Sequence, residues 1–233
     1  MNEKAKNFPE QFSKTAQLLG NNAIRLLNKS KIAIFGLGGV GSYALEALAR
    51  VGIGSFILVD NDTVSESNIN RQLLALHSTV GKLKVDVAKE RILDINPNVN
   101  VQTFACFYLP ENASNIDLSS CDYVIDCIDT VTAKVFLAEH TRQINVPIIS
   151  SMGTGNKLDA TKLEITQIEK THTCPLAKVL RTELRKRNIK NLKVVYSTEK
   201  PQKNLHPPAS ISYVPSCAGL LLAQEVIKDL LNY

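Results

Sequence analysis

The stretch "IAIFGLGGVGSYALEALARVGIGSFILVDND", residues 32–62, decides the fold class. A short apolar run leads into a glycine-rich turn, a helix pattern follows over 40–51, and a second apolar run covers 55–60. A strand, a turn, a helix and a strand within about 30 residues form the βαβ unit of a parallel sheet. The stretch therefore predicts an α/β protein, and its glycine turn is a candidate phosphate site.

The rest of the chain continues this alternation. Helix patterns cover 84–94 and 133–143, and strand patterns cover 99–105, 122–128 and 147–151. Their order predicts a doubly wound, mainly parallel Rossmann-like sheet. An alternating strand, a helix over 174–187, the strand "LKVVYS" and a closing helix then predict a C-terminal β/α extension. We divide the chain into a helical segment (1–30), a nucleotide-binding core (31–152) and a substrate-binding extension packed on the core (153–233), as one domain overall.

Composition excludes several classes of protein. With 233 residues and 44% hydrophobic content, the chain is long enough for one sizeable core. No apolar run approaches the ~20 residues that cross a bilayer, and the first residues lack an apolar signal core. We therefore expect a cytoplasmic protein without membrane contact. Five cysteines without a CxxC pair indicate reduced thiols rather than a zinc knuckle.

The positive charge is concentrated late in the chain. Residues 157–203 hold 12 Lys and Arg against 5 Asp and Glu, so this segment carries all of the net +5 of the chain. In the helix at 174–187, we expect Thr173 as the cap and an apolar face that includes Val179. Lys178, Arg181 and Arg185 cluster on the opposite face. Such a patch is either a solvated surface or the contact for a polyanion such as a nucleic acid.

The glycine turn by itself favours a dinucleotide. Gly36, Gly38 and Gly41 fit the G-x-G-x-x-G fingerprint, with Gly39 as an additional glycine, and Asp60 ends the next strand where a ribose-binding acid belongs. A lone fingerprint of this kind is weak, and it leaves NAD, FAD and ATP open.

The residues after the second strand favour ATP. Binding of an NAD ribose needs only one acid, so the second acid, Asp62, has no role in an NAD site. The alternative role of Asp62 is to cap the loop. Asn68 and Arg71, three residues apart, suit phosphate oxygens, which a guanidinium binds through two N–H groups. Lys84 opens a helix and adds its charge to the positive end of the dipole, which suits a triphosphate.

A further pair of acids, Asp126 and Asp129, ends the strand over 122–128. Ligands bind at the carboxyl ends of parallel strands, and a carboxylate there can hold Mg²⁺ on phosphates. We assign the metal to Asp129. For Asp126 we favour a strand-end carboxylate that is hydrogen-bonded to the backbone.

The ordered motifs GLGGVG, DND, SNINRQ, GKLK and DCIDT resemble the adenylating superfamily of ubiquitin-activating enzymes and the ThiF and MoeB sulfur-carrier adenylyltransferases. The resemblance implies that Asp60 binds the ATP ribose, that Asn68, Arg71 and Lys84 contact phosphates, and that Asp129 binds Mg²⁺. Arg71, Lys84 and Asp129 would then be the catalytic residues of an adenylating enzyme.

The segment 152–199 and the start "FSKTAQLLG" resemble one branch, the tRNA threonylcarbamoyladenosine dehydratases. That branch activates the threonylcarbamoyl carboxylate on a tRNA adenosine beside the anticodon with ATP, and then closes a ring. The resemblance implies a tRNA substrate held by Lys178, Arg181 and Arg185, a homodimer in which Lys14 faces the partner protomer's ATP site, and sulfur-transfer partner proteins.

Other functions stay open at this point. The alternative is an adenylyltransferase that activates the carboxy terminus of a sulfur-carrier protein, although the paired CxxC motifs common there are absent. A non-catalytic nucleotide-binding partner protein and an NAD oxidoreductase are further options. The second of these leaves the Asn–Arg–Lys set unexplained.

Overall fold

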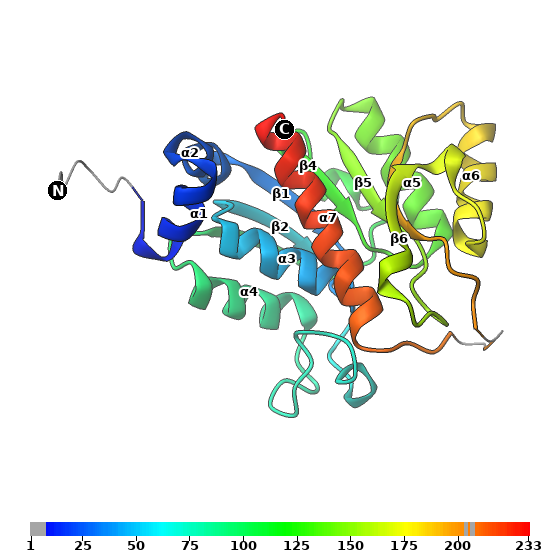
Figure 1. The fold of residues 1–233 in the computed structure, drawn as a ribbon, viewed down its shortest axis with the longest axis horizontal. Helices are drawn as coiled ribbons and strands as arrows, with labels where there is room; N and C mark the ends of the chain where they lie inside the picture. Colours follow the sequence, from blue (N-terminus) through cyan, green and yellow to red (C-terminus); the bar gives the residue numbers. More distant parts are fainter. Residues whose placement is uncertain (1–7, 203–204, 206–207) are drawn as a thin grey trace.

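Seven strands form one sheet through the computed structural model, which describes residues 8–202, 205 and 208–233 (Figure 1). Lys203, the last residue of the basic segment, lies outside the described residues. The strands are β1 (Lys31–Phe35), β2 (Ser55–Val59), β3 (Asn100–Phe104), β4 (Tyr123–Asp126), β5 (Ile148–Ser151), β6 (Leu163–Gln167) and β7 (Lys193–Ser197). Their order is β3-β2-β1-β4-β5-β7-β6. Among the pairings of these seven strands, β6–β7 alone is antiparallel. The predicted doubly wound, mainly parallel sheet is confirmed.

Helices connect the strands and cover both faces of the sheet. They are α1 (Ser13–Leu19), α2 (Asn21–Lys29), α3 (Gly41–Val51), α4 (Lys84–Ile95), α5 (Val131–Gln143), α6 (Pro175–Lys186) and α7 (Tyr213–Leu231). The helices predicted over 40–51, 84–94 and 133–143 match α3, α4 and α5 to within two residues. In the part of the chain that the structure describes, no helix combines the length and the apolarity of a membrane span.

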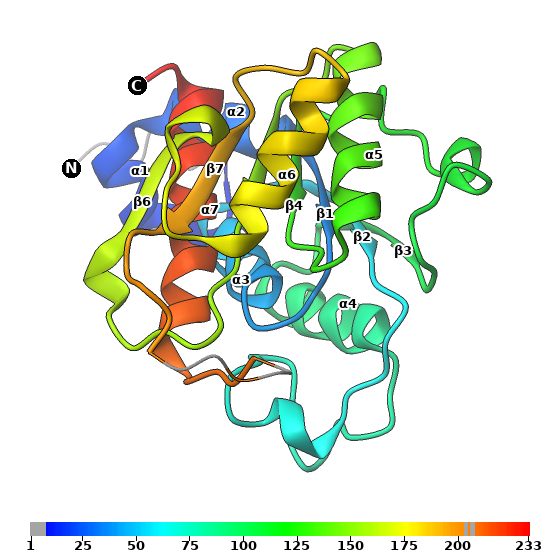
Figure 2. The same cartoon turned by 90° about the vertical axis from the view of Figure 1, so that its right-hand side faces the viewer.

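Alternation along each strand sends side chains to two separate cores. In β1, Ile32 and Ile34 pack with α3, α4 and α7, whereas Ala33 and Phe35 pack with α5 and the segment before β4. A third core joins α5, α6 and β7. Figure 2 shows α5 and α6 together on one side, with α7 crossing α3 on the other. Burial on both faces explains why these strands read as continuous apolar runs.

The close crossing of α3 and α7 depends on one glycine. A Cβ on Gly219 would lie 2.2 Å from the carbonyl oxygen of Val40, so no larger residue fits there without moving a backbone. This contact presses α7 against the start of α3. It therefore fixes the position of the glycine turn that precedes α3.

The strand order places a topological switch point at β1, which lies between β2 and β4. Phe35, the last residue of β1, is in register with Val59 of β2 and with Asp126 of β4. Three strand ends therefore coincide at one edge, and their next residues begin the loops that build a site. Open α/β sheets bind ligands at this place.

The helix predicted over 174–187 is α6, and two of its details differ from the prediction. Its N-cap is Cys174, without a side-chain cap bond, whereas Thr173 has a φ of 59° and donates to a neighbouring carbonyl. Leu180 and Leu184 are buried as expected, but Val179 is 48% exposed. One residue is about 100° of helical rotation, and this turns Val179 away from the buried side.

Candidate active site

Two glycines of the turn are required by the backbone itself. Gly36 has a φ of +85°, and a Cβ there would lie 2.7 Å from the carbonyl oxygen of Cys127. A Cβ on Gly41 would lie 1.8 Å from the carbonyl oxygen of Gly36. These positions let the end of β1 pass against the loop after β4. Gly36 and Gly41 therefore determine the shape of the turn, and the other residues of the turn are the candidates for contact with a ligand.

The other two glycines border a cavity. Gly38 and Gly39 line a cavity of about 550 Å³ at the carboxyl ends of β1, β2 and β4. The N–H groups of Gly38, Gly39 and Val40 have no acceptor among the described residues. Free N–H groups at the start of a helix form a binding site for an anion. The turn can therefore hold a phosphate group without rearrangement.

Asp60 follows β2 and is held rigidly at the edge of this cavity. Its Oδ2 accepts the N–H of Leu37 at 2.6 Å, and its Oδ1 accepts the N–H of Asp62 at 2.8 Å. Burial raises the pKa of the Asp60 carboxyl above its usual value, against the two backbone donors, which lower it. Each carboxylate oxygen keeps a second lone pair, so the group can still accept a hydroxyl donor from a ligand.

Lys84 is the first residue of α4, and its side chain lines the cavity beside Asp62. The two side chains form an ion pair, with 2.7 Å between Lys84 Nζ and Asp62 Oδ2, and the Lys84 N–H donates to the Asp62 carbonyl. Lys84 is buried, whereas the Asp62 side chain is more than half exposed. An ammonium has three donors, so it keeps capacity for a ligand oxygen while paired. Asp62 thus orients the lysine, a role that goes beyond capping the loop.

Asn68 and Arg71 lie on the long loop between β2 and α4, and this loop contains a short 3₁₀ helix, Glu66–Asn68. Asn68 is buried, and its Oδ1 accepts the N–H of Ser65 as part of a capping box. Arg71 donates from Nη1 to the carbonyl of Ser67 and to Asn70 Oδ1. Both residues line the cavity, as their motif predicts. Arg71 is anchored through one nitrogen, which leaves the rest of the guanidinium for a ligand.

The two acids after β4 have different environments. Asp126 is buried and accepts from Lys134 Nζ at 2.9 Å and from the N–H of Ile128 at 3.0 Å. This agrees with the strand-end interpretation of Asp126, but the buried ion pair with Lys134 is not predicted by the sequence. Asp129 is exposed and lines the cavity, with a single long hydrogen bond of 3.3 Å from Thr130. Its carboxylate therefore has free lone pairs beside the glycine turn.

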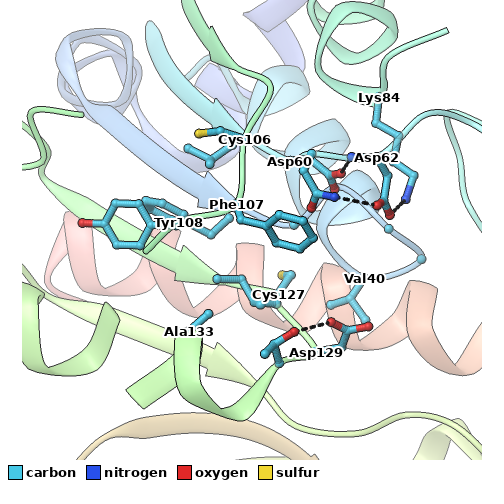
Figure 3. A pocket seen from close by; sticks show the side chains of 18 of the residues that line it. Val40, Asp60, Asp62, Lys84, Cys106, Phe107, Tyr108, Cys127, Asp129 and Ala133 are labelled. Atoms are coloured by element: carbon cyan, nitrogen blue, oxygen red, sulfur yellow. Dashed lines mark hydrogen bonds and ion pairs between the residues drawn. The ribbon is translucent and has the colours of Figure 1, made fainter. Parts of the chain in front are cut away.

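An apolar wall closes the other end of the cavity, in residues that the sequence analysis did not single out. Cys106, Phe107 and Tyr108 follow β3 and line the cavity together with Cys127. Figure 3 shows the Phe107 ring pointing into the space between Asp60 and Cys127. The ring is 61% exposed, which is unusual for a large apolar side chain. The cavity thus combines a polar end and an apolar end, as a nucleotide does.

The three basic residues assigned to the substrate lie on α6, and none of them lines the cavity. Lys178 and Arg185 are exposed. Arg181 is half-buried and donates from Nη1 to both oxygens of Thr171, at 2.8 Å to the carbonyl and 2.7 Å to the hydroxyl. Arg181 thus fastens α6 to the preceding loop. Cys174, the N-cap residue of α6, is buried, and Lys14 is exposed on α1.

These features define the class of protein: an α/β protein of the nucleotide-binding type, whose candidate phosphate site combines a glycine turn with an arginine and a lysine. Comparison with known proteins gives the family. The model described as "ThiF family" matches residues 12–233, and the chain belongs to the ThiF family.

Individual relatives narrow the comparison. The tRNA threonylcarbamoyladenosine dehydratase of Bacillus subtilis is 44% identical over 95% of this chain and 95% of its own length. The crystal structure of the E. coli tRNA N6-threonylcarbamoyladenosine dehydratase in complex with ATP matches with a TM-score of 0.90 and 33% identity, over 98% of this chain and 96% of that chain. The adenylyltransferase and sulfurtransferase UBA4 of Candida glabrata is 34% identical, but over only 64% of this chain and 34% of its own length.

Proposed function

We propose that this protein is an ATP-dependent tRNA dehydratase that converts threonylcarbamoyladenosine beside the anticodon into its cyclic form. One observation carries the proposal: the glycine turn, Asp60, Arg71, Lys84 and Asp129 surround a single cavity. The chain also matches tRNA dehydratases over nearly their whole length, one of them solved with ATP. The match to the sulfur-carrier adenylyltransferase covers a smaller part of both proteins, which disfavours that alternative.

The chemistry follows from the charges around the cavity. The threonylcarbamoyl carboxylate attacks the α-phosphorus of ATP, and pyrophosphate leaves. A nucleophilic atom of the carbamoyl group then attacks the activated carbonyl, releases its proton to solvent and expels AMP, which carries away one oxygen of the carboxylate, so the net change in the nucleoside is loss of one water. Arg71 and Lys84 stabilise the negative charge that builds on the α-phosphate, a contribution that is usually the largest in such sites. The free N–H groups of the glycine turn hold the phosphate chain.

A magnesium ion fits the acid at this site. Mg²⁺ is commonly bound by one or two carboxylates together with substrate phosphates, and the exposed, weakly bonded carboxylate of Asp129 meets that requirement. Asp129 would hold the ion, which when bound would neutralise charge on the departing pyrophosphate. Among the described residues no group of three or more His, Cys, Asp or Glu side chains could hold a metal ion, and substrate phosphates and water would be the other ligands.

The extension 153–233 is assigned to the tRNA. Lys178 and Arg185 offer free positive charge on α6, outside the cavity, for contacts to the phosphate backbone. Arg181 contributes charge to the same face while it is bonded to Thr171. Contacts of this kind make affinity fall steeply with salt. The proposal also includes a homodimer that places Lys14 near the partner protomer's ATP site. Sulfur-transfer partner proteins and a cytoplasmic location are its remaining parts. Analytical ultracentrifugation tests the dimer.

Product analysis provides the direct test. The protein is incubated with ATP, Mg²⁺ and tRNA that carries threonylcarbamoyladenosine, and the nucleosides are analysed by mass spectrometry for loss of one water. Carboxylate labelled with ¹⁸O should transfer one label to AMP. Arg71→Ala and Lys84→Ala should abolish ATP–pyrophosphate exchange in a folded protein. An unchanged nucleoside, or label that stays out of AMP, would refute the proposed reaction.

A further inference from the structure

Phe107 has no role in the proposed chemistry, although its side chain lines the cavity. The ring is 61% exposed, and among the described residues it is the one exposed large apolar side chain that lines the cavity. Single apolar side chains on a convex surface are ordinary, but ligand sites are concave and lined by apolar and aromatic groups. The ring points into the space between Asp60 and Cys127 (Figure 3). It therefore offers apolar surface to whatever occupies this end of the cavity.

The neighbours of Phe107 hold its loop in place, so the exposure of the ring is not the effect of a loose loop. Tyr108, the next residue, is buried, and its hydroxyl is hydrogen-bonded to His140 Nδ1 at 2.5 Å. The Asn112 side chain bonds the loop twice. Its Oδ1 accepts the N–H of Leu109 at 2.9 Å, and its Nδ2 donates to the carbonyl of Phe107. A ligand that contacts the ring therefore meets a group that is already ordered.

The order of the strands matches the order of the parts of a nucleotide. The glycine turn follows β1, Asp60 follows β2, and Phe107 lies three residues after the end of β3. These strands are neighbours in the order β3-β2-β1. Asp60 joins the three loops, since its Oδ2 accepts the N–H of Leu37 in the turn and its own N–H donates to the carbonyl of Phe104. With the phosphates at the turn and the ribose at Asp60, the base reaches the Phe107 end.

We propose that the Phe107 ring stacks on the base of the bound nucleotide. The inference rests on the proposed binding of ATP. A base is a flat ring system that stacks on aromatic side chains, whereas phosphates and ribose hydroxyls offer no such surface. Every base has a π face, so the ring favours ligands that carry a base over those that lack one and does not choose among bases.

A tryptophan at this position reports stacking directly. The chain contains no tryptophan, so Phe107→Trp carries the only indole and keeps an aromatic face. ATP should quench its fluorescence, with a midpoint that matches the dissociation constant from calorimetry. Ribose 5-triphosphate, which lacks the base, should leave the emission unchanged. Val179→Trp is the matched control, since Val179 is 48% exposed on α6 outside the cavity, and ATP should not change the emission of that variant.

Two further substitutions separate stacking from a structural role. Phe107→Ala should weaken ATP binding about 5- to 150-fold in calorimetry and leave the binding of ribose 5-triphosphate unchanged, because the contacts to phosphate and ribose remain. Phe107→Tyr keeps the aromatic ring and should bind ATP as tightly as the natural protein. Without nucleotide, Phe107→Ala should melt at the temperature of the natural protein, because an exposed ring contributes little to folding.

The outcomes are distinct. Unchanged ATP binding by Phe107→Ala would overturn the assignment, and so would equal weakening of ATP and ribose 5-triphosphate, which indicates a distorted loop. The assignment also fails if Phe107→Trp binds ATP in calorimetry without a change in its emission. In each of these cases the natural protein still binds ATP, so the proposed function stands. If the natural protein does not bind ATP at all, the proposed function fails and this inference fails with it.

Discussion

Replacing Lys134 by Met should destabilise the protein by about 3–5 kcal/mol, because it leaves the Asp126 carboxylate buried without its partner. The Lys134 side chain is 0% exposed and that of Asp126 is 1% exposed. The ammonium uses all three donors, at 2.9 Å to Asp126 Oδ2, 3.0 Å to Ser150 Oγ and 2.8 Å to the Ser151 carbonyl. The variant removes every one of these bonds at once.

The expected loss is large on the scale of a single domain. Native domains are stable by only about 5–15 kcal/mol. In a chain of this size each kcal/mol lowers the melting temperature by about 2–4 °C, so we expect a fall of about 6–20 °C. Calorimetry measures the melting temperature, and urea titration should show a lower midpoint with an unchanged slope.

Two companion variants make the test specific to burial and charge. Lys186→Met removes a lysine with a shorter ion pair, 2.7 Å to Glu183, but its side chain is 63% exposed. Solvent screens that pair, so the melting temperature should hardly change. Asp126→Asn combined with Lys134→Met removes both buried charges and keeps an acceptor for the Ile128 N–H. It should recover much of the stability that Lys134→Met alone loses. If Lys134→Met melts like Lys186→Met, or if the double variant is no more stable than the single one, the reasoning is refuted.

Three other predictions follow from the site. Gly41→Ala should prevent folding, because the new Cβ would lie 1.8 Å from a backbone oxygen. Gly38→Ala should fold normally, because the nearest atom to its Cβ would be 3.7 Å away, and it should bind ATP more weakly. Circular dichroism measures the folding of both variants, and calorimetry measures ATP binding. Lys178→Glu with Arg185→Glu should weaken tRNA binding and flatten its salt dependence while ATP binding persists, and unchanged tRNA affinity would make this face a merely solvated surface. Because burial raises the pKa of Asp60, ATP affinity should fall on acidification at a pH above the ordinary carboxyl value of 3.8, and Asp60→Asn should remove that step. The raised pKa means that the folded state binds this proton more tightly than the unfolded chain does, so this carboxyl stabilises the fold at low pH and loses that effect as pH rises. Protonation of Asp60 therefore does not itself promote unfolding, and circular dichroism over the same pH range checks that the protein stays folded.

The sequence predicts the sheet well because its signals are local. The helix and strand boundaries in the core follow apolar periodicity and the glycine turn, and the structure confirms them to within two residues. The clustering of Asp60, Arg71, Lys84 and Asp129 could also be predicted, since each follows or faces the carboxyl end of a parallel strand. The strand order then brings them to one edge of the sheet.

What the sequence could not predict depends on contacts between distant segments. Lys134 reads as an ordinary helix lysine, because its partners lie 8, 16 and 17 residues away and meet it only after β4, β5 and α5 have packed. Arg181 fits a solvated face by spacing, but the path of the loop at Thr171 brings an acceptor to it. Phe107 carries no periodic signal, since it lies on a loop. Its exposed ring is recognised only once the cavity is known.

The two cations of the site are held before any ligand arrives, and this decides what the site does best. Arg71 is held by Ser67 and Asn70 through Nη1, and Lys84 is held by Asp62, and each keeps other donors for a ligand in the cavity that both residues line. Donors that need no reorientation stabilise charge more effectively than mobile ones, because the cost of ordering them is met during folding. A dinucleotide has only two phosphates and gains little from two prearranged cations beside a glycine turn. A triphosphate under attack at its α-phosphorus gains most, since negative charge increases there as the carboxylate approaches.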